Sequence, residues 1–337
     1  FVVRESMAWL REQSSAQPAE PWLLYASFVH PHFPMNAPRR FCQRYWPDGV
    51  TSPRIGPGGD GWEHPSTQAA LCANGGESQG YFCADITPEQ TLRARAAYFA
   101  CVDHLDEIIG DFLALLERDG LLDNTIVVYT SDHGELGGEH GLWWKQTWHE
   151  ASVRVPLIIS TPEHRRGESA PIVVDDPVSL GDLFPTLCGL VGASVPGGLD
   201  GADLSAVVRG GDARAMPERP GVLVENLNAY PAPGLEYRLL RSARYKYIAF
   251  NQYQDLAFDL LEDPYEQRNL LGGAEGVVAE ELERMRAAIY TNFSFDSAVE
   301  SMQRERAEFM RRYPSRIRPA TSNQIMRGDG ILVEADQ

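Results

Sequence analysis

The tetrapeptide Ser131-Asp-His-Gly134 combines two side chains that can hold a divalent cation. Asp132 offers a hard oxygen ligand and His133 a borderline nitrogen ligand. The tetrapeptide directly follows residues 125–130, Thr-Ile-Val-Val-Tyr-Thr, whose apolar, β-branched composition predicts a buried strand. In open α/β sheets, ligands bind beyond the carboxyl ends of the strands. Taken alone, the tetrapeptide fits a divalent-metal site at Asp132 and His133 and fits equally well a polar turn that merely ends the strand.

A second candidate group lies in residues 141–146, Gly-Leu-Trp-Trp-Lys-Gln. Lys145 and Lys246 are the only lysines of the chain, and every other cation among its 30 Lys and Arg residues is an arginine. Lys145 is a compact point charge that can reach an anionic oxygen, so we predict a functional role for it rather than that of a solvated surface lysine. Trp144 can shape the substrate pocket, and His149 either faces the same cleft or begins the next element.

Two histidines follow another apolar segment. Residues 21–29 predict a buried strand of a parallel sheet, and they run into His30-Pro-His-Phe-Pro34, where two prolines stop any regular element. If this strand and the one before Asp132 lie in one parallel sheet, His32 and Asp132 open onto the same edge. A histidine there can donate to an anionic substrate oxygen or protonate a leaving group. For His30 we prefer a capping role in a stiff loop.

The remaining pattern places these groups on an α/β scaffold. A long helix is predicted to begin at Pro88, with Thr87 as its N-cap and Gln90 completing a capping box, and to end before Gly120 as its C′ glycine. Strands that alternate with helices indicate an α/β fold with a largely parallel sheet sandwiched by helices. Short alternating strands after Pro220 indicate a small C-terminal antiparallel α+β subdomain. Further predicted helices cover 2–13, 180–191 and 277–290, and further strands cover 155–160, 222–225, 237–242, 245–250 and 256–260.

We divide the chain into the α/β domain (1–219), the antiparallel subdomain (220–300) and an extended tail (301–337). Residues 46–80 are rich in Gly and Pro without periodicity, which predicts a long irregular loop of the kind that is often functional. The tail is rich in arginine and has little core of its own to bury. We therefore predict that it reaches a neighbouring subunit in a homo-oligomer.

Composition excludes several classes of protein. The 337 residues carry a formal net charge of −17, which argues against a nucleic-acid partner because phosphate contacts need clustered positive charge. No run approaches the ~20 apolar residues that cross a bilayer, so we predict no membrane association. The five cysteines are widely spaced and form no CxxC pair, which favours a reducing compartment and hence a cytoplasmic over a periplasmic location.

Several segments together resemble the sulfatases of the alkaline phosphatase superfamily, and they look closest to the choline-sulfatase-like branch. They follow the family order from about residue 21 to residue 270: His30-Pro-His-Phe-Pro34, then 125–134, then Gly138-Glu-His-Gly-Leu-Trp-Trp-Lys145, then Arg154-Val-Pro-Leu-Ile-Ile159, then Asp182-Leu-Phe-Pro-Thr-Leu187, and lastly 258–270.

The resemblance implies a hydrolase that cleaves a small-molecule sulfate monoester to an alcohol and sulfate. By the same match, Asp132 and His133 are ligands of a divalent metal, usually Ca²⁺, with Mn²⁺ or Mg²⁺ as alternatives. Lys145 would bind the sulfate on the side of the nucleophile, and His32 would contact the sulfate or the leaving oxygen. A metal and a cation around a sulfuryl group offset the charge on its oxygens and orient it for in-line attack.

The sequence departs from the family at the nucleophile. That group is a formylglycine made from Cys or Ser in a Cys/Ser-x-Pro-Ser/Ala-x-Arg type of motif, and none of the five cysteines stands in such a motif. We therefore interpret the chain as the later part of a longer protein and expect it to turn over no sulfate ester alone. Two alternatives stay open: a phosphonate monoester or phosphodiester hydrolase of the same superfamily, and a non-catalytic sulfatase-like binding protein.

Overall fold

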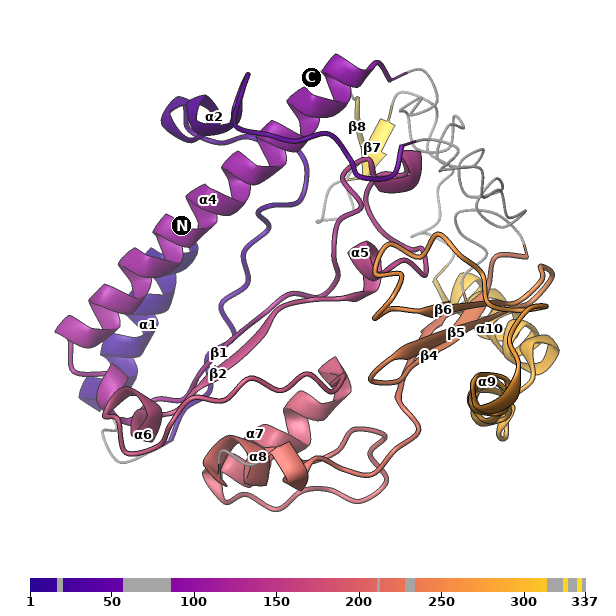
Figure 1. The fold of residues 1–337 in the computed structure, drawn as a ribbon. Coiled ribbons are helices and arrows are strands. Elements are labelled where there is room, and N and C mark those ends of the chain that lie inside the picture. The colour runs from indigo at the N-terminus through magenta and orange to yellow at the C-terminus, as the bar shows by residue number, and fades with distance from the viewer. Residues whose placement is uncertain are drawn as a thin grey trace.

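The structure is a computed structural model, and it describes residues 1–16, 21–56, 86–210, 213–227, 234–313, 324–326 and 332–334. It contains helices and strands in the mixed order expected of an α/β protein (Figure 1). Most of the predicted loop 46–80 and two of the five cysteines, Cys72 and Cys83, lie outside these ranges. The described part of this loop, residues 46–56, begins with a turn at 46–49 and contains no helix or strand.

Two long helices form the N-terminal side of the molecule. Helix α4 (Pro88–Arg118) begins at the predicted capping box, in which Thr87 and Gln90 exchange hydrogen bonds, and Gly120 follows its end with a φ of +68°. Helix α1 (Val2–Ala16) packs along one half of α4, and α2 (Arg39–Tyr45) packs at the other half (Figure 1). The apolar stripes of α1 and α4 meet in a small core of Met7, Leu10, Phe112 and Leu116.

The central strands are antiparallel, so the prediction of a largely parallel sheet is wrong for the strands that the structure describes. β1 (Val127–Thr130) pairs with β2 (Leu157–Ser160), with Val127 opposite Ser160. Parallel pairing needs a crossover of a dozen or more residues, usually a helix. The connection between β1 and β2 contains only the short η4 (Glu139–Gly141) and α5 (Glu150–Val153), and it returns the chain beside β1 in the opposite direction.

The predicted strand 21–29 is also absent. These residues run as an irregular, extended segment whose side chains alternate between exposed and half-buried. Leu23 and Tyr25 are among the exposed ones. The segment has the alternation of a strand, but it forms no ladder with any strand in the described ranges, and a strand exists only through such pairing.

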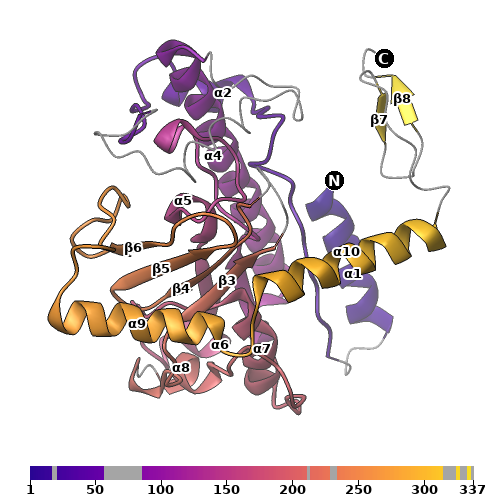
Figure 2. The ribbon, with the colours of Figure 1, turned by 90° about the vertical axis from the view of Figure 1, so that its right-hand side faces the viewer.

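The C-terminal half forms the antiparallel sheet that the sequence predicts. Its order is β3-β4-β5-β6, with every neighbouring pair antiparallel. Helix α9 (Gly276–Tyr290) covers one face by packing on β4 and β5, and the loop that precedes α5 covers the other (Figure 2). The strands span β3 Val222–Asn226, β4 Tyr237–Arg241, β5 Tyr245–Phe250 and β6 Leu256–Asp259.

The prediction of an extended tail is wrong for residues 301–312, which are helical. Helix α10 (Phe295–Arg312) continues through residues 301–312 and projects from the sheet (Figure 2). Its charged side chains form i,i+3 and i,i+4 neighbours, which support a helix that has little core to face. The short strands β7 (Gln324–Met326) and β8 (Leu332–Glu334) pair beyond it. The domain boundaries at 219/220 and 300/301 stay predictions.

The other elements are short connectors. The predicted helix 180–191 is observed as η5 followed by α7, with Ser179 as the cap and Gly192 at a φ of +72°. The bounds are η3 Leu122–Asn124, α6 Pro162–Arg165, η5 Leu180–Asp182, α7 Leu183–Val191, α8 Ser205–Gly210 and η6 Ala213–Ala215.

No helix in the described ranges is long and apolar enough to span a membrane.

Candidate active site

The Asp132–His133 pair lies just beyond the end of β1. His133 Nδ1 lies 2.8 Å from the carbonyl oxygen of Gly134, and we assign the ring proton to this nitrogen. Nε2, which lies 3.4 Å from Asp132 Oδ2, then keeps a free lone pair, as a metal-ligating histidine requires. The Asp132 side chain is 80% exposed, and its Oδ1 accepts the backbone N–H of His133 at 3.0 Å. An oxygen ligand and a nitrogen ligand are therefore close enough to bind one metal ion together.

Gly134 fixes the backbone of this pair. Its N–H donates to the carbonyl oxygen of Ser152 at 2.8 Å. A Cβ at position 134 would lie 2.0 Å from the carbonyl oxygen of Ala151, so a residue larger than glycine would collide with backbone. The end of β1 is thereby held against α5, and the sequence Asp-His-Gly ends in glycine for a packing reason.

Lys145 lies in a tightly bonded loop. Glu135 accepts the backbone N–H of Trp144 at 2.7 Å and that of Gly137 at 3.0 Å, and the N–H of Leu136 donates to the carbonyl oxygen of Trp144 at 2.8 Å. The Lys145 side chain is half-buried. Hydrogen bonds between residues 135–136 and Trp144 therefore close the loop that precedes Lys145, and this loop begins directly after the Asp132–His133 pair.

Aromatic contacts link His32, a predicted site residue, to the loop that carries Lys145. The His32 ring lies 4.1 Å from the Phe33 ring, and Phe33 lies 5.7 Å from Trp144, centroid to centroid. His30 instead packs on His104, and its Nε2 bonds the carbonyl oxygen of Asn36 at 2.9 Å, as a loop-stabilising histidine would. The structure thus joins the His32 segment to the Lys145 loop. Between described residues, no hydrogen bond or ion pair links either of them directly to Asp132 or His133.

Comparison with known proteins identifies the scaffold that carries these residues. The family described as "Sulfatase" matches residues 2–193, which is more than half of the chain and includes His32, the Asp132–His133 pair and Lys145. The chain belongs to the sulfatase family. A second description, "N-sulphoglucosamine sulphohydrolase, C-terminal", matches residues 138–290.

This sulfatase-family chain is similar to several curated sulfatases. It is 33% identical over 313 residues to the choline-sulfatase of Rhizobium meliloti (strain 1021), covering 91% of this chain and 58% of that protein. It is 30% identical over 278 residues to an arylsulfatase of Clostridium perfringens (strain 13 / Type A), covering 82% and 54%. The chain thus spans about half the length of the curated relatives that it matches.

Solved structures share the fold. The phosphonate monoester hydrolase of Agrobacterium radiobacter superposes with a TM-score of 0.67 at 23% identity, covering 98% of this chain and 63% of that one. The predicted resemblance to the sulfatases is confirmed. At the level of fold, the likeness extends to phosphonate hydrolases.

His149 has a different place from the other predicted site residues of this sulfatase-family chain. It is 1% exposed and occupies the N-cap position of the short α5 without a side-chain capping bond, and its ring lies 4.3 Å from that of His140 and 4.9 Å from that of Trp148. Burial, with smaller contributions from His140 and Lys246, holds the pKa of His149 well below its usual value, so the ring is neutral. His149 thus begins the next element, and its contact with substrate stays a prediction.

A buried ionic cluster lies next to His149, and sequence reasoning missed it. Lys246 on β5 is fully buried, and its Nζ donates to Glu266 Oε1 at 2.7 Å and to Glu150 Oε1 at 3.0 Å. Burial raises the pKa of Glu266. For Glu150 burial also acts to raise the pKa, but Lys246 and the nearby Arg241 lower it overall. The rarity of lysine in the sequence drew attention to Lys145 and not to Lys246.

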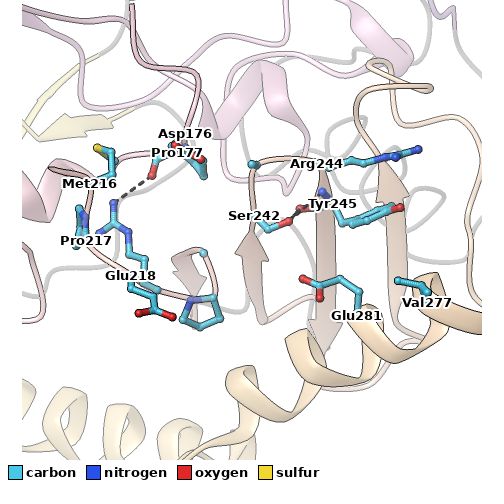
Figure 3. A pocket seen from close by; sticks show the side chains of 14 residues that line it. Asp176, Pro177, Met216, Pro217, Glu218, Ser242, Arg244, Tyr245, Val277 and Glu281 are labelled. Atoms are coloured by element: carbon cyan, nitrogen blue, oxygen red, sulfur yellow. Dashed lines mark hydrogen bonds between the residues drawn. The ribbon is translucent and has the colours of Figure 1, made fainter. Parts of the chain in front are cut away.

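A separate pocket of about 510 Å³ lies at one end of the C-terminal sheet (Figure 3). The turn between β4 and β5, with Ser242 and Tyr245, forms one wall, and the start of α9 forms another. Arg219 on a third wall is already engaged by Asp182 at 2.8 Å, and Arg244 by Asp259 at 2.7 Å. None of the predicted site residues lines this pocket, and we assign no ligand to it.

Proposed function

We propose that the protein to which this chain belongs is a sulfuric ester hydrolase that cleaves a small-molecule sulfate monoester. The observation that carries the proposal is the family match over residues 2–193, because it contains His32, the Asp132–His133 pair and Lys145 in family order. The names of the relatives support the same reaction, since choline-sulfatase and arylsulfatase are both sulfate ester hydrolases by name.

In this proposal Lys145 binds the sulfate group and His32 contacts the sulfate or the leaving oxygen. A lysine ammonium can neutralise an anionic oxygen, and an imidazole can hydrogen-bond to the oxygen that departs with the alcohol. Trp144, which contacts Phe33 beside His32, would form part of the wall of the substrate pocket. The formylglycine nucleophile is proposed to lie outside this chain, which alone would therefore be inactive.

Asp132 and His133 are proposed to hold the divalent cation, with Ca²⁺ preferred and Mn²⁺ or Mg²⁺ as alternatives. The free Nε2 of His133 and the exposed carboxylate of Asp132 fit such an ion as two of its ligands. The ranges that the structure describes contain no group of three ligating residues, so the pair is a partial set. A bound cation would polarise the sulfuryl oxygens.

A specific observation favours a second candidate reaction, the hydrolysis of phosphonate monoesters. Two phosphonate monoester hydrolases superpose on this chain with TM-scores of 0.67 and 0.66. The deciding experiment compares kcat/KM of the full-length protein on 4-nitrophenyl sulfate and on a 4-nitrophenyl phosphonate monoester, with Lys145→Ala as the control for background hydrolysis. Faster sulfate cleavage that falls in the Lys145→Ala variant is expected. Faster phosphonate cleavage would replace the proposal by the second candidate.

We also propose a homo-oligomer formed through residues 301–337 and a cytoplasmic location. In support of the first, the side chains of α10 from Met302 onward are exposed, including the apolar Phe309 and Met310. In support of the second, Cys42, Cys101 and Cys188, which the structure describes, are all free thiols.

A further inference from the structure

Lys145 is flanked on both sides by residues in the left-handed region of backbone space. The φ of Trp144 is +67° and that of Gln146 is +72°. Bulky side chains disfavour this conformation, which persists only where surrounding structure holds the backbone in place. The position of Lys145 therefore depends on whatever holds the neighbouring residues.

The C-terminal sheet holds residues 146–150, which we call the anchor segment. Asn226 Nδ2 on β3 donates to the carbonyl oxygen of Gln146 at 3.2 Å. The Tyr237 hydroxyl on β4 donates to the carbonyl oxygen of Thr147 at 3.0 Å. Trp148 is fully buried in the core beneath the sheet. Successive residues immediately after Lys145 are thus tied to successive strands.

The anchor segment ends at the buried ionic cluster. Glu266 Oε2 accepts the backbone N–H of Glu150 at 2.7 Å, while Glu266 Oε1 accepts from Lys246. Lys246 in turn bonds the side chain of Glu150. Because Lys246 is fully buried, these contacts do not compete with water. They join Glu150 to β5 and to the loop after β6 at the same point.

We propose that the C-terminal sheet positions Lys145 for sulfate, with Tyr237, Lys246 and Glu266 acting as positioning residues through the anchor segment. The inference rests on the proposed function, in which Lys145 binds the sulfate group. A displacement of a binding group by about 1 Å can cost on the order of a hundredfold in activity, so an anchor of this kind matters even though it touches no substrate.

The two lysines provide a direct test on the full-length protein. Lys145 is half-buried and Lys246 fully buried, so acetylation of the peptide that contains residue 145 reports Lys145. The measured quantity is the ratio of the labelling rates of that peptide without and with inorganic sulfate, with sodium chloride holding the ionic strength constant. By mass action this ratio is about 4 at a sulfate concentration of about three times Kd, and about 1.3 if the affinity falls tenfold.

Tyr237→Phe is the main variant because it removes one hydroxyl and keeps the ring. Its matched control is Tyr247→Phe, since Tyr247 lies on the next strand, is 3% exposed like Tyr237, and donates to Asp255 rather than to the anchor segment. Lys246→Met tests the ionic end of the anchor. Urea midpoints identify any variant that is not folded under the labelling conditions.

The expected result is a ratio of about 4 in the wild type and in Tyr247→Phe, and about 1.3 in Tyr237→Phe and Lys246→Met. Equal ratios in the wild type and in folded Tyr237→Phe would overturn the positioning role and leave the proposed function intact. A fall of the same size in Tyr247→Phe would also overturn it, because any loosening of the sheet would then suffice. No protection of wild-type Lys145 would remove both this inference and the role of Lys145 on which it rests.

Discussion

Replacing Lys246 by methionine should strongly destabilise the protein. The ammonium is fully buried and lies 2.7 and 3.0 Å from carboxylate oxygens of Glu266 and Glu150. Methionine fills a similar length, so the main effect is the loss of the cation between two buried carboxylates. Removing one partner of a buried ion pair costs about 3–5 kcal/mol. We expect a loss of this size in the free energy of unfolding, measured by urea denaturation at pH 7 with tryptophan fluorescence.

A second substitution should rescue part of this loss. In Lys246→Met/Glu266→Gln one of the two unpaired charges is removed, while the glutamine oxygen can still accept the backbone N–H of Glu150. The double variant should therefore recover about half of the lost stability or more. Arg93→Met is the control, because both side chains of its pair with Glu89 are exposed, by 63% and 66%, and such pairs contribute about 1 kcal/mol or less.

The loss in Lys246→Met should also depend on pH. Burial already raises the pKa of Glu266 above its unfolded value, and removal of Lys246 raises it further. A group with a raised folded pKa stabilises the protein at low pH and loses that contribution as pH rises. The deficit relative to wild type should therefore shrink from pH 8 to pH 5. A deficit under about 1 kcal/mol at pH 7, or a double variant less stable than the single one, would refute this account of the cluster.

Three further predictions follow from other parts of the chain. Asp132→Ala should weaken Ca²⁺ or Mn²⁺ binding at least about tenfold by calorimetry, whereas Asp123→Ala should leave it unchanged; equal affinities would contradict the metal assignment. Burial acts to raise the pKa of Asp182, but Arg219 and two backbone N–H groups lower it overall, so its contribution to stability is lost as pH falls. The difference in urea midpoint between wild type and Asp182→Asn should accordingly narrow below about pH 4, and a constant difference would contradict it. Deletion of residues 301–337 should reduce the oligomer mass in light scattering, and an unchanged mass would refute the role of the tail.

Local signals in the sequence predicted local structure well. The capping box at Thr87, the glycine after α4 and the strands β3 to β6 each depend on residues close together in the chain. The largely parallel sheet was predicted wrongly for the described strands, since β1 and β2 pair antiparallel; apolar composition marks a strand but does not choose its partner. Residues 21–29 show the same limit, since their alternation is that of a strand and the pairing is absent from the described ranges.

The residues of the candidate site likewise divide into those that the sequence could predict and those that it could not. Asp132 and His133 could be found because they are adjacent and follow a strand directly. The cluster around Lys246 could not, because Glu150 lies 96 residues from Lys246 in the chain and Glu266 lies 20 residues from it. Besides the rarity of lysine, its trace in the sequence is a cation inside the apolar run Tyr245–Phe250, where a charged residue implies a buried partner somewhere in the fold.

Lysine stands at only two positions of this chain, where every other Lys or Arg position is an arginine, and each of the two has its own role. At Lys246 the fully buried ammonium donates to two carboxylates, whereas the broad planar guanidinium of arginine carries five N–H donors that would all need partners there. At Lys145 a compact charge would meet a single sulfate oxygen. The first lysine ties Glu150 to the sheet, and the second lies at the start of the segment so tied. The positioning inference predicts that Lys246→Arg impairs sulfate protection of Lys145 without touching sulfate, and intact protection in the folded variant would contradict the role assigned to Lys246.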